Sequence, residues 1–276
     1  MKITNALTLL GSSLLLTGCF EGNKNTEQLC NDNPALQCER LNIDDGQCRV
    51  PRTDLIWHRF EVLKNPTDTN QIKEYLLLAD YRKCLELAAQ IQPLDQTNLK
   101  QRRFNALVNS GEDLEHIVTK LQQSSSPNAL YFLWSQIGDD QARRRFLQLE
   151  GSPALESAEM QYALATFYTS RDQGKTRQLL FHALELTKGN NINTEIFKSL
   201  ASTTYRLNLK EEAYIWTRIA ESFNVPIASQ SELQLLYGFE PSIYDQLDDI
   251  AEQIEDSIRA GTFNSEQIPK FASAKR

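Results

Sequence analysis

The sequence has few of the residues and motifs that usually carry catalytic or metal chemistry. Its 276 residues include three histidines, which form no His-x-x-x-His or His-Glu pair. The sequence contains no Gly-x-Ser-x-Gly, no phosphate-binding Gly-Lys-Ser/Thr loop and no Gly-x-Gly-x-x-Gly. We therefore predict no metal, no cofactor and no catalytic residue, and we expect His58, His116 and His182 to pack or to be exposed rather than to bind metal.

The chain also lacks an excess of positive charge. It has 29 Lys and Arg against 36 Asp and Glu, a formal net charge of -7, so no overall positive field would hold a polyanion, and we predict no nucleic-acid partner. Basic residues gather at Lys100, Arg102 and Arg103 and at Arg143–Arg145. We interpret them as solvated charges, with a contact to anionic lipid or to a partner as the alternative.

No hydrophobic run is long enough to span a membrane as a helix, which takes about 20 apolar residues. The longest candidate, Ala6–Leu16, is interrupted by Gly11, Ser12 and Ser13 and follows the charged Lys2. This arrangement is typical of a secretory signal peptide, which we assign to residues 1–18.

The four residues Leu16-Thr17-Gly18-Cys19 that follow the run resemble the lipobox of bacterial lipoproteins. The resemblance implies that cleavage occurs after Gly18 and that Cys19 becomes the lipidated N-terminus, with residues 19–29 as a tether. Phe20 replaces the Asp of an inner-membrane retention signal, which implies the outer membrane and, most simply, its periplasmic face. The alternative is a secreted or membrane-anchored protein in which Cys19 is incidental.

Four further cysteines, Cys30, Cys38, Cys48 and Cys84, form an even set in a compartment that oxidises thiols. We predict two structural disulfides. The first three lie in an irregular segment, 30–52, that is rich in Asn, Asp, Pro and Gly, and one arrangement would join this segment to a helix through Cys84. Four cysteines allow three connectivities, and a zinc site is the competing interpretation, although the spacings are longer than usual.

The rest of the chain predicts an all-α fold, because apolar residues recur at helical spacing between Pro and Gly. We expect N-terminal helices over 53–126, including one capped by Thr53-Asp54, one at 69–90 with a break near Asp80, and a hairpin of 99–109 and 113–122 turning at Gly111. Helical repeats follow over 127–226, and capping helices with a tail over 227–276. The predicted helices of the last two regions are 128–137, 140–149, 153–169, 175–186, 194–207, 210–223, 231–237 and 242–260.

A period in the mid-thirties runs through 128–226. At an offset of 37 residues, Thr176 aligns with Ala213 and Ala183 with Ala220. Small residues at fixed positions allow helical hairpins to stack closely. Together with Tyr162-Ala163-Leu164-Ala165, this pattern resembles tetratricopeptide and Sel1-like repeats, although their Trp-Leu-Gly-Tyr signature is absent. An irregular helical bundle is the alternative.

Four stretches carry a second resemblance over the whole mature chain: Arg49–Phe60, Tyr81–Pro93, Leu130–Gln136 and Glu232–Phe239. They are similar to a family of predicted lipoproteins of unknown function from marine and related gammaproteobacteria. This resemblance implies a lipoprotein and supplies no activity.

These observations together predict a lipid-anchored, non-catalytic helical-repeat scaffold that binds an envelope protein or peptide. The alternative is an enzyme acting on the cell wall or on a small substrate, for which no carboxylate spacing stands out. We expect the recurring aromatic residues to fill the core between hairpins rather than to bind a peptide; they are Tyr131, Trp134, Phe167, Tyr168, Tyr205 and Trp216. We expect the acidic side of 242–260 to be a solvated face.

Overall fold

The computed structural model describes residues 25–92, 97–188 and 192–271, and in these ranges the protein is all-α, with helices and turns and no strand. The predicted signal peptide, Gly18 and Cys19 lie outside the described residues. The chain divides into two compact units, which are described separately. Unit 1 takes its described residues from 25–65 and Leu77–Gly111, and unit 2 takes them from Pro66–Leu76 and 112–271. None of the described helices is both long and apolar enough to cross a membrane.

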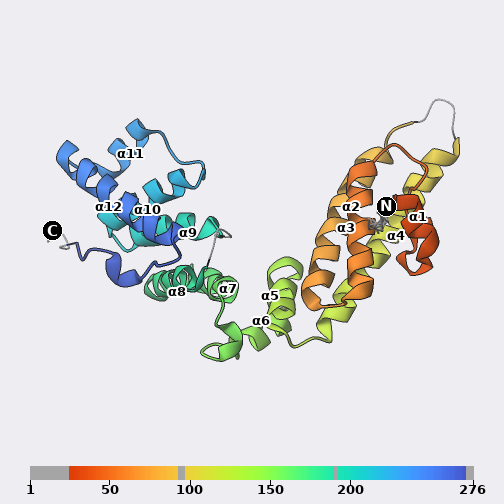
Figure 1. The fold of residues 1–276 in the computed structure, drawn as a ribbon, viewed down its shortest axis with the longest axis horizontal. Coiled ribbons are helices and arrows are strands. Elements are labelled where there is room, and N and C mark those ends of the chain that lie inside the picture. The colour runs from red at the N-terminus through yellow and green to blue at the C-terminus, as the bar shows by residue number, and fades with distance from the viewer. Residues whose placement is uncertain (1–24, 93–96, 189–191, 272–276) are drawn as a thin grey trace, which may run out of the picture. The chain divides into compact units, whose positions relative to one another are not determined.

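Unit 1 begins with short helices and continues with long ones (Figure 1). The helix α1 (Thr26–Asp32) starts at a capping box formed by Asn25 and Gln28, and two 3-10 turns follow, η1 (Pro34–Leu36) and η2 (Cys38–Arg40). The segment predicted to be irregular is thus partly helical. The unit is completed by α2 (Arg49–Lys64) and by parts of α3 (Asp68–Ala88) and α4 (Thr97–Gln122). Its core includes the fully buried Leu29, Leu36, Leu55, Ile56, Leu78, Tyr81 and Leu85.

Three predictions about helix boundaries in this region are wrong. The helix α2 starts at Arg49 rather than at a Thr53 cap, because Cys48 takes the left-handed conformation (φ 59°) and ends the preceding turn. No break occurs near Asp80, since α3 is continuous. The expected hairpin at Gly111 is instead the middle of the single helix α4.

Gly111 has a packing role in place of a turn. A Cβ at this position would lie 2.8 Å from Nη1 of Arg82, closer than non-bonded atoms normally approach. The missing side chain lets the guanidinium reach the surface of α4, where Nη1 donates to the Leu107 carbonyl at 3.0 Å. A glycine inside a helix can therefore mark a close approach as well as an end.

Unit 2 contains a row of helices whose starts follow ordinary capping chemistry. Ser126, Asp139, Ser157 and Asp172 each accept a hydrogen bond from the first turn of the helix that follows. The unit's helices and turns are α5 (Pro127–Phe132), the π-helical turn η3 (Leu133–Ile137), α6 (Asp140–Leu147), η4 (Pro153–Leu155), α7 (Ala158–Tyr168), α8 (Gln173–Leu186), α9 (Glu195–Arg206), α10 (Lys210–Ser222), α11 (Gln230–Tyr237), α12 (Pro241–Arg259) and η5 (Ser265–Gln267).

The helices α7 to α10 of unit 2 pack each on the next, and α12 packs on α10 (Figure 1). The small residues that the repeat analysis aligned are buried at equivalent places. Thr176 and Ala213 are both completely buried, as is Ala183, and Ala220 is 1% exposed. The all-α prediction is confirmed, and α7–α10 form a helical repeat-like array; the likeness to tetratricopeptide or Sel1 repeats stays a prediction.

Aromatic side chains fill the interior of this array. Trp216 is completely buried and stacks on Phe197, with 6.4 Å between ring centroids, while Phe263 meets its edge at 6.0 Å. Earlier in the unit, Trp134 contacts Phe146 and Phe167, each at 5.8 Å. The expectation of core packing therefore holds for Trp216, whereas Trp134 is partly buried and Tyr205 is 40% exposed.

Candidate functional site

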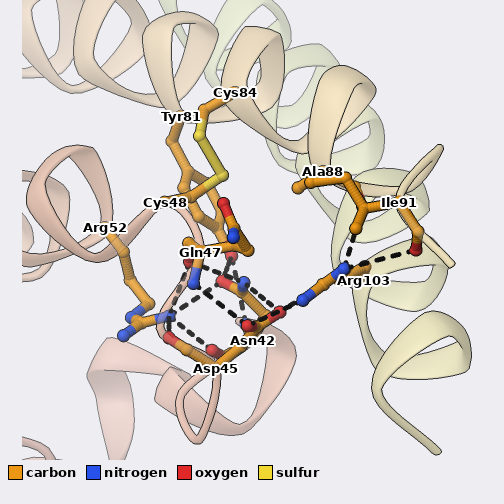
Figure 2. Close-up of polar contacts among 10 residues, drawn as sticks. All are labelled: Asn42, Asp45, Gln47, Cys48, Arg52, Tyr81, Cys84, Ala88, Ile91 and Arg103. Carbon is orange, nitrogen blue, oxygen red and sulfur yellow. Dashed lines mark hydrogen bonds and ion pairs between the residues drawn. A yellow bond between two sulfur atoms is a disulfide. The ribbon is translucent and has the colours of Figure 1, made fainter. Parts of the chain in front are cut away.

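A buried ion pair lies at the centre of unit 1. Asp45, in the loop before α2, accepts two hydrogen bonds from the Arg103 guanidinium on α4, 2.5 Å from Nε to Oδ2 and 3.0 Å from Nη2 to Oδ1 (Figure 2). The two side chains are only 4% and 5% exposed. Arg103 also donates to the Ala88 carbonyl at the end of α3, 3.1 Å away. The prediction that Arg103 is a solvated charge is wrong, because no sequence signal identified its carboxylate partner 58 residues away.

A second arginine is surrounded by oxygen atoms of the same loop. Nη1 of Arg52 donates to the carbonyls of Asn42 and Asp45, at 2.5 and 2.9 Å, and to the side-chain oxygen of Asn42 at 3.1 Å (Figure 2). The Tyr81 hydroxyl donates to that same side-chain oxygen at 2.6 Å and accepts from the Asn42 backbone amide at 3.1 Å. We call Asn42, Asp45, Arg52, Tyr81 and Arg103 the polar cluster; it connects the loop to three helices.

The groups of the polar cluster have fixed protonation states at neutral pH. The hydrogen bond from Arg103, followed by those from Gln47 and Asn42, lowers the pKa of Asp45 to about 2 against the opposing effect of burial. Burial raises the pKa of Tyr81 to about 12 and lowers that of Arg52. Asp45 is therefore ionised and Tyr81 neutral at neutral pH. These protonation states suit a structural network better than acid–base catalysis, which needs a group that titrates near the working pH.

The four cysteines of unit 1 are paired as disulfides, Cys30 with Cys38 and Cys48 with Cys84, with Cα–Cα distances of 5.9 and 5.7 Å. The second disulfide joins the loop to α3 directly beside the polar cluster (Figure 2). Of the three connectivities left open above, the observed one pairs Cys84 of α3 with Cys48 and leaves Cys30 and Cys38 paired within the segment. Within the described ranges no group of His, Cys, Asp and Glu is arranged to hold a metal ion.

Unit 2 carries a hollow of about 740 Å³ between α8, the start of α10 and the chain's C-terminal segment. Phe181, Ile268 and Phe271 provide apolar surface, and side chains of both charge signs surround them. We call this the α8 hollow. Its lining residues are Arg177, Gln178, Phe181, His182, Glu185, Leu209, Glu212, Ser265, Glu266, Ile268, Pro269, Lys270 and Phe271.

Two carboxylates of the α8 hollow are held by hydrogen bonds. Glu212, which is 3% exposed, binds Arg177 through two contacts of 2.7 and 2.8 Å. Glu185 accepts from the Ser265 backbone amide at 2.8 Å, which attaches η5 to α8. Burial opposes ionisation of Glu185, but the hydrogen bonds from Ser265 and the nearby His182 outweigh it and lower the pKa of this carboxyl.

The three histidines do not come together. His58 is buried in α2 and His116 is exposed on α4. His182 lies on α8 with Nε2 2.8 Å from a Glu156 oxygen and Nδ1 3.6 Å from a Glu185 oxygen. These placements agree with packing or exposure for His58 and His116, whereas the carboxylates beside His182 could not be foreseen from its helix alone.

The acidic side of α12 is only partly the solvated face that we expected. Asp248 accepts hydrogen bonds from the Tyr214 hydroxyl at 3.0 Å and from Arg218 Nε at 2.8 Å, both on α10. Burial, together with the neighbouring Asp248 carboxylate, raises the pKa of Tyr214. Asp248 thus helps to hold α12 against α10.

A family model for a protein of unknown function (DUF2989) matches residues 16–218. The chain belongs to this family. The match includes Cys19, both disulfides, the polar cluster and the helices α7–α9, and it stops within α10. The α8 and α10 sides of the α8 hollow therefore lie in the family region, whereas the C-terminal segment that lines its third side follows it. No curated protein and no solved structure matches the chain.

Proposed function

We propose that this DUF2989 protein is a lipid-anchored protein of the bacterial envelope. In this proposal residues 1–18 are removed, Cys19 carries the lipid, and the body lies on the periplasmic face of the outer membrane. The lipobox-like residues Leu16–Cys19 support it. The two disulfides add support, because such bonds persist in oxidising compartments such as the periplasm.

Replacement of Cys19 by alanine tests the anchor. The wild-type protein is expected in the membrane fraction with a mass increased by the lipid, and the Cys19→Ala protein in the soluble periplasmic fraction. Membrane association at the wild-type level of a Cys19→Ala protein from which residues 1–18 have been removed would contradict the proposal. Sucrose-gradient separation of inner and outer membranes then tests the location.

For the body, the proposed function is binding of a protein or peptide partner at the α8 hollow, without catalysis. The observation that carries this proposal is the convergence of α8, α10 and the C-terminal segment on one open surface. Exposed charges of both signs around an apolar floor suit the mixed side chains of a peptide. Glu185 has a lowered pKa, whereas a general acid requires a raised one, and both carboxylate oxygens of Glu212 are engaged by Arg177.

Site-specific photocrosslinking in the intact, acylated protein tests this binding site. Gln178 lies in the α8 hollow and is exposed, so a photoreactive residue there leaves the core intact. Ser202 is an exposed position on α9 outside the hollow and provides the matched control. A single adduct of defined mass is expected from position 178, with its identity established by mass spectrometry. Equal adducts from both positions, or none from position 178, would refute the assignment of the hollow.

A further inference from the structure

The helix α2 exposes an unusual stripe of side chains to solvent. Val50 is 67% exposed and Trp57 is 38% exposed. They are seven residues apart, so they lie on one face of the helix about 10 Å from each other. Lys64 continues the same stripe a further seven residues on. An aliphatic residue and a tryptophan on one exposed face are typical of surfaces that meet the membrane interface, where the amphipathic indole is favoured.

The start of this stripe lies next to the point where the chain enters unit 1. Thr26 and Glu27 of α1 line the same hollow as Arg49 and Thr53 in the first turns of α2. Cys19 lies six positions before Asn25, the first described residue, and six fully extended residue steps reach at most about 22 Å. If Cys19 carries a lipid, the bilayer surface lies within that distance of α1, and hence close to the start of α2.

The charges on the exposed side of α2 indicate the type of surface that it fits. The exposed ionic side chains of this helix are Arg49, Asp54, Glu61 and Lys64, two of each sign. Asp54, Glu61 and Lys64 lie within about 40° of Val50 and Arg49 about 100° from it, so the face has no excess of positive charge and an anionic lipid surface would gain no net attraction. A zwitterionic phospholipid surface matches this balance, and it can accept Val50 and Trp57 at headgroup depth.

We infer that the Val50–Trp57 face of α2 rests on the zwitterionic phospholipid surface to which Cys19 anchors the chain. This inference relies on the proposed lipid anchor and adds the orientation of unit 1 at the membrane. The face supplements the anchor: the lipid brings the protein to the bilayer, and the two side chains determine which side of unit 1 contacts it.

Fluorescence quenching by brominated lipid tests this contact in the full-length acylated protein. The protein is reconstituted into phosphatidylcholine vesicles with or without bromine on the acyl chains near the headgroups. In a Trp57→Phe background, whose emission from Trp134 and Trp216 is measured separately and subtracted, Val50→Trp places the reporter on the proposed face. Leu63→Trp, in the same background, is the matched control, because Leu63 is also exposed (48%) on α2 but points about 140° away from Val50.

The expected result is at least a two-fold greater loss of reporter fluorescence in brominated vesicles for Val50→Trp than for Leu63→Trp. Vesicle flotation of the wild-type and Cys19→Ala proteins is measured in parallel. If the acylated proteins float but position 50 is not quenched, or both positions are quenched equally, the inference is overturned and the anchor stands. If the wild-type protein carries no lipid and does not float, both ideas are refuted.

Discussion

Removing the charge of Asp45 while keeping its shape is the most direct test of what holds unit 1 together. Asp45→Asn leaves the Arg103 guanidinium in a site where the arginine side chain is only 5% exposed. The fall in the Asp45 pKa from 3.8 to about 2 corresponds to about 2.5 kcal/mol of favourable interaction with the ionised form. Breaking a buried pair by removing one partner destabilises by about 3–5 kcal/mol. We therefore expect Asp45→Asn to lower the free energy of unfolding of unit 1 by about 3 kcal/mol.

The neighbouring pair provides a matched control. Asp44 and Arg102 are 3.1 Å apart, with side chains 74% and 44% exposed. An exposed pair of this kind contributes little, so Asp44→Asn is expected to change stability by less than about 0.5 kcal/mol. Native-state hydrogen exchange, followed by mass spectrometry with the disulfides intact, measures both variants in peptides of α2 and uses peptides of α9 as an internal reference. A loss for Asp45→Asn no larger than that for Asp44→Asn would refute the reasoning.

Three further predictions concern unit 1. Because the pKa of Asp45 is lowered on folding, the contribution of this carboxylate to the free energy of unfolding is complete above about pH 5 and is lost as the pH falls toward 2. The stability difference between wild type and Asp45→Asn, measured by urea unfolding, should therefore shrink from pH 5 to pH 2, and a constant difference would contradict the ion-pair explanation. Gly111→Ala gains about 1 kcal/mol of helix propensity but displaces Arg82 from a charged hydrogen bond worth about 1.5–3 kcal/mol. We expect it to lower the free energy of unfolding by about 1 kcal/mol in the wild type and to raise it in an Arg82→Ala background. The same sign in both backgrounds would disprove the proposed contact. Replacing Cys48 and Cys84 by serine opens a 36-residue loop and should destabilise unit 1 by about 4 kcal/mol in chemical unfolding. Replacing Cys30 and Cys38, which close a shorter loop, should cost about 2.5 kcal/mol. A larger effect of the Cys30–Cys38 replacement would contradict the loop-closure argument.

Helix positions in unit 2 were predictable because local signals agree there with packing. Asp172 caps α8 where the apolar period begins, whereas the predicted start of α7 at 153 is wrong, because Pro153–Leu155 form a separate 3-10 turn and the helix begins after the Ser157 cap. The predicted ends of α8, α9 and α10 differ from the observed ones by one or two residues at most. Local propensity and tertiary burial favour the same structure in this part of the chain, which is the condition for reading helices from sequence.

The errors in unit 1 have a common physical origin in contacts between residues distant in the chain. Gly111 was predicted to form a turn because the sequence does not show that Arg82, 29 positions earlier, occupies the space that a Cβ would fill. Arg103 reads as a surface charge until Asp45 is placed beside it. Asp45 and Tyr81 carry no local pattern that marks them as buried partners. One available signal was Cys84, since a disulfide from the loop to α3 would bring the loop's polar residues against that helix.

The way in which Arg52 binds the loop before α2 has a consequence for how relatives of this protein can vary. Its guanidinium contacts main-chain oxygens of Asn42 and Asp45, which any residue would supply. Asp44 is exposed, and a Cβ at Gly46 would meet nothing within 4 Å. The side chains at positions 44 and 46 can therefore change during evolution, whereas the number of residues between Asn42 and Arg52 is constrained. An insertion or deletion in this loop would remove carbonyls from the reach of Arg52, so family members that keep Arg52 should share the loop's length more strictly than its composition.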